Sequence, residues 1–163
     1  YSPSNYVGKP IICTNPCAEV PLEDGGACNL GSINLSRFVK DGFTANASID
    51  WDQLAESTET LVRFLDNVVT WNEDLNALEK QRKAAAETRR LGLGVMGIAD
   101  MLNQLGIAYD SEQGTMMIEK IMEYITNAAY QASSFIAKEK SPSPIFNEKS
   151  YMECPFVKEA LSD

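Results

Sequence analysis

Histidine is absent from this chain of 163 residues. Its absence excludes imidazole as a general base and excludes any zinc site that needs a histidine from this chain. No apolar run approaches the roughly 18 residues of a membrane-spanning helix, so we expect no membrane partner. The first residues have neither the charged nor the apolar region of a signal peptide, and no initiator methionine. We therefore expect the sequence to be an internal fragment of a longer protein.

Basic residues are scarce, since 14 Lys and Arg stand against 23 Asp and Glu and give a net charge of −9. Nonspecific nucleic-acid binding depends on Lys and Arg at phosphates, so we expect no nucleic-acid partner. An apolar content of 44% and a charged content of 23% are ordinary for a globular domain. With no secretory signal, the four cysteines favour a reducing compartment, the cytoplasm, where thiols act in redox chemistry or bind metal.

Hydrophobic periodicity predicts strands alternating with long helices, which indicates an α/β fold. We expect strands at residues 11–14, 27–35 and 91–95, the first two forming a wide hairpin around the loop between them. The predicted helices are residues 50–72, 77–90, 98–105 and 111–138. The last of these carries an apolar stripe at helical spacing: Ile118, Ile121, Ile125, Ala128, Ala132 and Phe135.

The loop at residues 15–22 concentrates polar groups. Asn15, Cys17 and Glu19 alternate, so in an extended backbone they would share one face. Pro16 has no N–H to give a sheet, which favours a loop over a central strand. An exposed thiol flanked by an amide and a carboxylate indicates chemistry rather than packing.

The other cysteines allow competing interpretations. Cys13 is expected to be buried in its apolar strand, and Cys154 has no supporting neighbours. A zinc site made of the cysteines or a disulfide between Cys17 and Cys28 would make the chain a helical interaction module without catalysis. Structural zinc favours closely spaced ligand pairs, and only Cys13 and Cys17 approach that spacing, so we expect no metal site.

Two further patterns resemble binding motifs. Gly92, Gly94 and Gly97 have the spacing of a dinucleotide-binding loop, but the polar residues before them predict no buried strand. We interpret these glycines as points of close packing between a strand and a helix. The basic residues nearby are interpreted as a solvated helix face rather than a phosphate site: Lys80, Arg82, Lys83, Arg89 and Arg90.

Two motifs in their order carry a family resemblance. Asn15-Pro16-Cys17-Ala18-Glu19 and Cys28-Asn29-Leu30-Gly31-Ser32-Ile33-Asn34-Leu35 resemble the active-site region of the catalytic large subunit of ribonucleotide reductases. Residues 89–102 resemble a later stretch of the same family. The resemblance implies a ten-stranded α/β barrel with long helices and a central finger loop that carries a cysteine. It also implies that residues 1–163 are an internal fragment of that barrel domain.

The resemblance implies roles for individual residues. Cys17 would become a thiyl radical that abstracts the ribose 3′-hydrogen, Glu19 would take the 3′-hydroxyl proton, and Asn15 would hydrogen-bond the ribose. The loop that would contact the substrate comprises Asn15, Pro16, Cys17, Ala18 and Glu19. Cys28 would be one of two redox-active thiols, with the second expected before residue 1 and the substrate-phosphate loop after residue 163.

The resemblance also implies a cofactor and partners. Pro16 before Cys17 is more similar to the adenosylcobalamin-dependent class than to the class I large subunit that depends on a di-metal partner, and that class remains the alternative. The implied activity is the reduction of ribonucleotides to deoxyribonucleotides for DNA synthesis. The implied partners are a nucleotide substrate and an external dithiol such as thioredoxin, with an oligomer possible, and we expect the isolated chain to be inactive.

Overall fold

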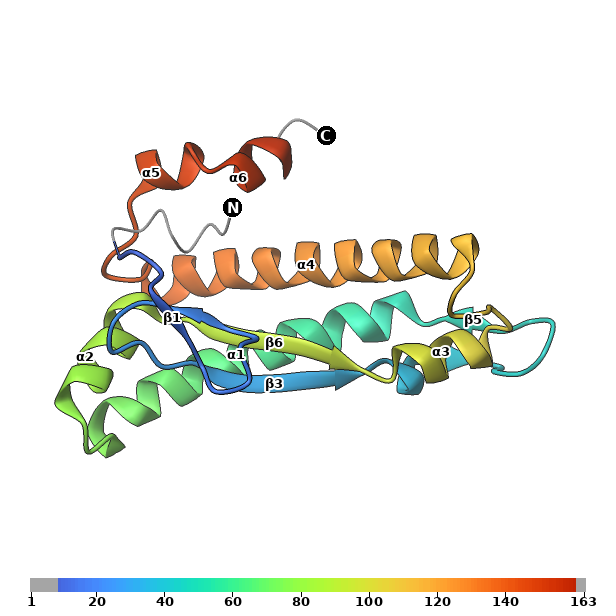
Figure 1. Ribbon diagram of the computed structural model, residues 1–163, viewed down its shortest axis with the longest axis horizontal. Helices are drawn as coiled ribbons and strands as arrows, with labels where there is room; N and C mark the ends of the chain where they lie inside the picture. The colour runs from blue at the N-terminus through green and yellow to red at the C-terminus, as the bar shows by residue number, and fades with distance from the viewer. Residues whose placement is uncertain (1–8, 161–163) are drawn as a thin grey trace. The chain divides into compact units, whose positions relative to one another are not determined.

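The computed structural model describes residues 9–160, and the chain divides into two compact units. Of the described residues, 9–29, 66–92 and 140–160 form the first, here called the hairpin unit, and residues 30–65 and 93–139 form the second, here called the core unit. Each of the two long helices, α1 (Trp51–Leu75) and α4 (Glu112–Lys140), contributes residues to both units (Figure 1).

Short strands and a long helix begin the core unit. β3 (Asn29–Asn34) pairs with β6 (Leu91–Met96), and their arrows point the same way in Figure 1. A 3₁₀ turn, η2 (Leu35–Phe38), follows β3, and β4 (Val39–Lys40) pairs antiparallel with β5 (Ser48–Ile49). Asp50 then caps α1, since its Oδ1 accepts from the Gln53 N–H at 3.2 Å, as its position before the apolar stripe predicts.

The hydrophobic core of this unit lies where β3, η2, α1, α3 (Ile98–Gln104) and α4 meet. The rings of Trp51 and Tyr124 add an aromatic contact between α1 and α4, with centroids 4.9 Å apart. Each fully buried large apolar side chain stabilises the fold by about 1.5–3 kcal/mol. The buried members are Ile33, Leu35, Phe38, Leu54, Met101, Ile121 and Ile125.

Gly94 and Gly97 permit close packing, but against β3 and the turn after it rather than, as the sequence predicts, between a strand and a helix. Gly97 stands directly before α3 at φ +73°, and a Cβ there would lie 2.5 Å from Asn34 Oδ1. A Cβ on Gly94 would lie 3.3 Å from Ser32 Oγ on the paired strand. Only a glycine fits the Gly97 position, because an L side chain there would be both strained and in collision.

The hairpin unit contains the shortest strands. β1 (Cys13–Thr14) pairs antiparallel with β2 (Pro21–Leu22), with Cys13 opposite Leu22. The predicted wide hairpin is therefore wrong: residues taken as loop supply the partner of β1, and β3 pairs with β6 instead.

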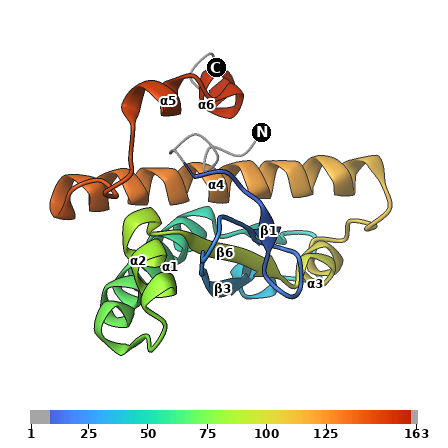
Figure 2. The ribbon, with the colours of Figure 1, turned by 60° about the vertical axis from the view of Figure 1, so that its left-hand side comes forward.

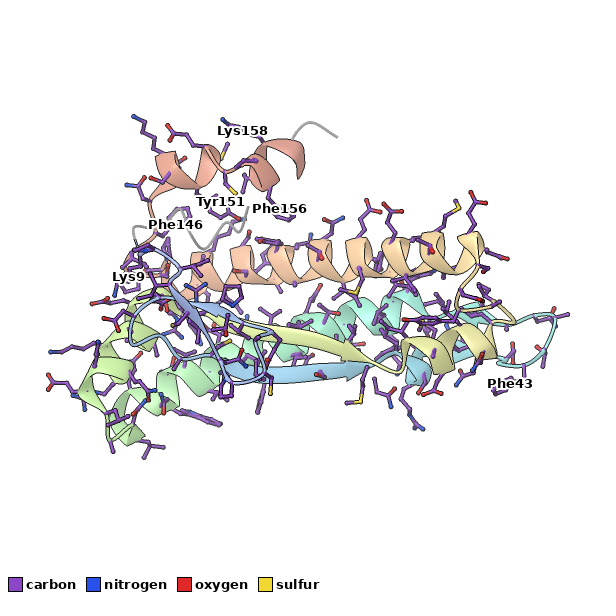
Figure 3. All side chains as sticks on the ribbon, viewed as in Figure 1. Lys9, Phe43, Phe146, Tyr151, Phe156 and Lys158 are labelled. Carbon is purple, nitrogen blue, oxygen red and sulfur yellow. The ribbon has the colours of Figure 1, made fainter. Side chains whose placement is uncertain are left out.

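Three short helices complete the hairpin unit: α2 (Glu79–Thr88), α5 (Glu148–Met152) and α6 (Pro155–Ala160). Figure 2 shows α5 and α6 following one another after the end of α4. Phe146, just before α5, packs against Tyr151 within it, with ring centroids 5.5 Å apart (Figure 3).

The predicted 111–138 helix exists as α4, with one error in its stripe. Phe135 is 54% exposed and Ile136 is buried, because the buried face continues from Ala132 by four residues rather than three. Ser111 caps the helix through a 3.0 Å bond from the Gly114 N–H to its Oγ.

The mixture of helices and strands agrees with the α/β prediction, and residues 9–160 close no barrel. Within the same residues, every helix is too short or too polar to cross a membrane.

Candidate active site

The loop at residues 15–20 joins the two strands of the β1–β2 hairpin and carries Cys17 on its surface. The Ala18 N–H donates to the Asn15 carbonyl at 2.9 Å, which closes a turn around Cys17. Ala18 adopts φ +63°, the left-handed region that non-glycine residues rarely enter. The chain thus folds back tightly at the cysteine, and the thiol is exposed at the tip of the hairpin.

Asn15 organises this loop with its side chain. Its Oδ1 accepts from the Val20 N–H at 2.9 Å, and its Nδ2 donates to Glu19 Oε1. The period-two argument from an extended backbone is wrong here, because the segment is a turn. Asn15 and Glu19 are brought together by a hydrogen bond across the turn instead.

A second turn, at residues 23–26, connects the hairpin to Cys28. The Gly26 N–H donates to the Glu23 carbonyl at 2.9 Å, and Gly25 has φ +73° in the third position, as type II turns require. Lys80 of α2 packs its stem on Gly25 and forms a 2.8 Å ion pair with Asp24. The turn thus depends on the positive φ of Gly25, and α2 anchors it.

The same turn holds a buried ion pair. Arg90 Nη2 donates to Glu23 Oε2, and the side chains are only 9% and 2% exposed, respectively. Arg89, the preceding residue, turns its side chain to Asp66 of α1. The interpretation of the basic residues as a solvated face holds for Lys80 and Lys83 but is wrong for Arg89 and Arg90.

Cys28 lies half-buried immediately before β3, with its thiol 3.3 Å from the Asn29 carbonyl oxygen that accepts its hydrogen bond. Burial raises the pKa of the Cys28 thiol, the Arg90 guanidinium opposes this rise, and the carboxylates of Glu19 and Glu23 add to it. The hairpin loop therefore lies close enough to Cys28 for its carboxylate to act on the thiol. The structure brings Cys28 into one unit with Asn15, Cys17 and Glu19.

Of the other two cysteines, Cys13 differs from its predicted environment, whereas the sequence predicts no environment for Cys154. Cys13 is exposed rather than buried, since both residues of its two-residue strand are exposed. Cys154, which had no supporting neighbours in the sequence, is fully buried. Within residues 9–160, which include all four cysteines, no disulfide is formed, so Cys17 and Cys28 are not bonded to each other. Among residues 9–160, no cluster of three acidic or cysteine side chains could hold a metal ion.

Sequence reasoning missed Glu23 and Arg90 as parts of this region. Glu23 follows Leu22, the last residue of β2, and Arg90 precedes Leu91, the first residue of β6. A charge of each sign in such buried positions is the signal that could have predicted their pairing, because buried charges are nearly always paired.

Residues 2–160 match the protein family described as "Ribonucleotide reductase, barrel domain". The vitamin B12-dependent ribonucleoside-diphosphate reductase of Mycobacterium tuberculosis strain H37Rv is 43% identical over 141 residues, which cover 86% of this chain and 19% of that protein. The protein of the same name from Thermoplasma acidophilum is 43% identical over 143 residues, 88% of this chain and 18% of the relative.

A more distant relative is the ribonucleoside-diphosphate reductase subunit alpha of Chlamydia pneumoniae, 35% identical over 145 residues, 85% of this chain and 13% of that protein. The chain thus spans about a fifth or less of the length of the curated relatives it matches. The family match nevertheless covers nearly the whole chain, including both cysteine motifs. This chain belongs to the ribonucleotide reductase family, within its barrel domain.

Proposed function

We propose that this chain is the internal part of a ribonucleotide reductase barrel domain that carries the hydrogen-abstracting cysteine, and that the complete enzyme reduces ribonucleotides to deoxyribonucleotides for DNA synthesis. The β1–β2 hairpin would be the finger loop of a ten-stranded barrel. One observation carries the proposal: Cys17 is exposed at the tip of a hairpin whose Asn15 side chain is bonded to Glu19. The relatives named as reductases support the choice of reaction.

The loop residues have distinct roles in this reaction. A thiyl radical at Cys17 would take the hydrogen atom from the ribose 3′-carbon, so that a C–H bond breaks and an S–H bond forms. Glu19 would accept the 3′-hydroxyl proton as radical character develops, which is general-base catalysis. The Asn15 amide, held by Val20 and Glu19, would orient the ribose. The substrate would contact the loop from Asn15 through Pro16 and Ala18 to Glu19.

Cys28 would supply half of the reducing equivalents. Two thiols would give two electrons and two hydrogens to the substrate, the 2′-oxygen would leave as water, and the thiols would end as a disulfide. Cys17 would then return its hydrogen to the 3′-carbon. The raised pKa of the Cys28 thiol supports this role, because a donor of both electrons and hydrogens must stay protonated.

Adenosylcobalamin is the cofactor that we assign to the complete enzyme. Its carbon–cobalt bond breaks homolytically when it is bound, and this chemistry supplies the oxidising equivalent for a thiol. The exposed position of Cys17 fits a thiol that must be reached by a group from outside the described residues. The two relatives with 43% identity are named vitamin B12-dependent, which supports the cobalamin class over the di-metal class.

The remaining partners follow from the reaction. The substrate would be a ribonucleotide, and an external dithiol such as thioredoxin would reduce the disulfide after each turnover. Four cysteines with no disulfide between them fit a reducing compartment such as the cytoplasm. With these partners, the complete enzyme is expected to act as a monomer or as an oligomer.

Cysteine substitutions in the complete enzyme test the proposal. Cys17→Ser should abolish turnover, because a hydroxyl cannot replace the thiyl radical. Cys28→Ser should stop multiple turnovers with dithiol reductants, because one half of the dithiol is missing. Cys13→Ser is the matched control, since Cys13 is also exposed in the hairpin but has no assigned role, and it should keep turnover. Normal turnover by Cys17→Ser would reject the assignment.

The radical-generating class needs a separate experiment. Purified complete enzyme should reduce ribonucleotides only when adenosylcobalamin is added. Activity that ignores adenosylcobalamin and requires a di-metal partner subunit would place the enzyme in the alternative class while leaving the roles of Cys17 and Glu19 intact.

A further inference from the structure

The ion pair between Glu23 and Arg90 leaves two buried polar atoms free. One guanidinium nitrogen, Arg90 Nη2, bonds one carboxylate oxygen, Glu23 Oε2. Among the side-chain atoms that the structure describes, Arg90 Nε and Glu23 Oε1 are buried without a hydrogen-bond partner. A buried polar group without a partner costs about 1–3 kcal/mol, so such atoms call for a functional explanation.

Glu23 is held in place from two sides. A Cβ on Gly26 would lie 3.1 Å from Glu23 Oε1 and 3.0 Å from its Cδ. The carboxylate therefore folds back over its own turn, toward the segment that leads to Cys28. Arg90 completes the arrangement because it follows α2, whose Lys80 clamps the same turn through Asp24.

Strand pairing places Arg90 beside Cys28. Cys28 directly precedes β3, and Arg90 directly precedes β6, its partner strand. Both arrows in Figure 1 run the same way, and Gly94 lies against Ser32 while Gly97 lies against Asn34. The offset of 62 positions between Gly94 and Ser32, carried back to the start of the two strands, brings the side chains of Arg90 and Cys28 to neighbouring positions.

We propose that the buried Glu23–Arg90 pair is a positioning device for Cys28, which keeps a guanidinium beside the sulfur and sets how readily the thiol ionises. Arg90 Nε is the donor available to a Cys28 thiolate, and Glu23 neutralises the guanidinium while the thiol is protonated. The inference rests on the proposed function, in which Cys28 is one of the two redox thiols. The charged groups that act on the sulfur are Arg90 before β6, Glu23 in the turn and Glu19 in the hairpin loop.

The device matters when the disulfide is reduced again. A thiolate of the external dithiol attacks one sulfur, a new S–S bond forms, and the old S–S bond breaks. Its electron pair leaves with the other sulfur, and a leaving thiolate with a lower pKa leaves faster. Where Cys28 is the leaving sulfur, Arg90 stabilises the thiolate until it takes up a proton.

Alkylation of Cys28 in the complete enzyme tests the proposal without requiring turnover. Iodoacetamide reacts with thiolates, so its rate at Cys28, followed by mass spectrometry between pH 6 and 10, gives an apparent pKa. Glu23→Gln leaves an uncompensated guanidinium, so alkylation of Cys28 should speed up at least about threefold below the pKa, a shift of about half a unit. Arg90→Gln leaves an uncompensated carboxylate and should slow it to a similar degree.

Changes of opposite sign in the Cys28 alkylation rate of Glu23→Gln and Arg90→Gln distinguish this positioning role from a merely structural one. Loosening of the site would expose the half-buried thiol, so alkylation would speed up and the apparent pKa of Cys28 would fall in both variants. Arg90→Lys keeps the positive charge, so its Cys28 alkylation rate should stay near that of the parent protein. The double variant Glu23→Gln/Arg90→Gln carries neither charge, so its rate should also return toward the parent rate. Asp24→Asn is the matched control, because its ion pair with Lys80 joins the same turn to α2 with both side chains 69% exposed, and it should leave Cys28 unchanged.

Cys154 reports on folding in the same experiment, because it is fully buried. If Arg90→Gln exposes Cys154 to labelling, the decision rests on Glu23→Gln, in which Cys154 must stay unlabelled to exclude loosening. A fall in the apparent pKa of Cys28 in Glu23→Gln supports the device, and shifts of the same sign in both variants, or none in Glu23→Gln, overturn it. Loss of the proposed reductase activity would leave these alkylation rates as they are, so the two proposals fail separately.

Discussion

Arg89 and Asp66 are joined by two hydrogen bonds from one guanidinium. Arg89 Nε donates to Asp66 Oδ1, and Nη2 donates to the Asp66 carbonyl oxygen, both at 2.9 Å. Lys140 Nζ donates to the other carboxylate oxygen, Oδ2, at 2.9 Å. One buried carboxylate of α1 thus holds the residue that ends α2 and the last residue of α4 within the hairpin unit.

Replacing this carboxylate is expected to destabilise the protein. Asp66→Asn leaves two cations facing a neutral amide, and removing one partner of a buried ion pair costs about 3–5 kcal/mol. We expect a loss of about 3 kcal/mol in the free energy of unfolding of the complete protein, measured by urea denaturation. Glu79→Gln is the control, since its ion pair with Lys83 is exposed and such surface pairs contribute little to stability. Equal effects of the two substitutions would contradict the assigned role of Asp66.

The Asp66 carboxyl should also make the stability of the protein depend on pH. Burial acts to raise the pKa of Asp66, but the hydrogen bonds and charges of Lys140 and Arg89 outweigh it and lower the pKa. A carboxyl with a lowered folded pKa stabilises the protein fully above its unfolded value of about 3.9 and loses that contribution as pH falls through the folded value. The stability difference between the parent and Asp66→Asn should therefore be constant near neutral pH and shrink below about pH 4. A difference that persists unchanged at pH 3 would show that the carboxylate charge is not its source.

Gly97 and Gly106 have the same backbone conformation, but replacing each by alanine should lower the free energy of unfolding by different amounts. Gly97 has φ +73°, and a Cβ there would meet Asn34 Oδ1 at 2.5 Å, whereas Gly106 has φ +72° with nothing within 4 Å of the same point. Gly106→Ala should cost about 1–2 kcal/mol for the left-handed backbone alone. Gly97→Ala should cost about 1–3 kcal/mol more, because the methyl group collides with Asn34.

Asn34→Ala provides the decisive background for this comparison. Removing the Asn34 side chain relieves the collision, so the excess cost of Gly97→Ala over Gly106→Ala should disappear in a double-mutant cycle of unfolding free energies. Asn34→Ala itself should cost about 1 kcal/mol, since Asn34 Oδ1 caps η2 through the Ser36 N–H. An excess that survives in the Asn34→Ala background would place the strain elsewhere.

The sequence predicted the long helices well because their burial is periodic. The helix expected at 50–72 is α1, Trp51–Leu75, and Leu54 and Leu65 from its stripe are fully buried. The strand pairing was not predictable in the same way. β2 contains only Pro21 and Leu22, too short for any pattern, and the pairing of β3 with β6 joins segments that are distant in sequence.

The residues of the candidate site likewise differ in whether a local sequence pattern predicts them. Asn15, Cys17 and Glu19 lie within one loop, so their types and spacing alone drew attention to them, and the turn brings Asn15 and Glu19 together. Arg90 is separated from Glu23 by 67 positions. Its ion pair arises only after α2 and the turn at residues 23–26 have folded against each other, which no local pattern encodes.

Asn15 provides a final prediction, because its two side-chain bonds can be removed separately. Asn15→Ala removes both, whereas Asn15→Asp keeps an oxygen for the Val20 N–H but sets a second negative charge against Glu19. Losing the bond to Val20 costs about 1 kcal/mol, so hydrogen exchange in peptides covering residues 15–20 should quicken about fivefold in Asn15→Ala. Asn15→Asp should exchange at nearly the parent rate.

Turnover should be impaired in both Asn15 variants, although hydrogen exchange should quicken only in Asn15→Ala. Because Asn15→Asp repels the Glu19 carboxylate and removes the amide that would bind the ribose, we expect it to lose at least about 100-fold in kcat despite an intact loop, the usual range for displacing a general base. Asn15→Ala should lose activity together with loop protection. If Asn15→Asp exchanged as fast as Asn15→Ala, the Val20 bond would not be what closes the loop. If Asn15→Asp kept full activity, the contact between Asn15 and Glu19 would have no part in positioning the base.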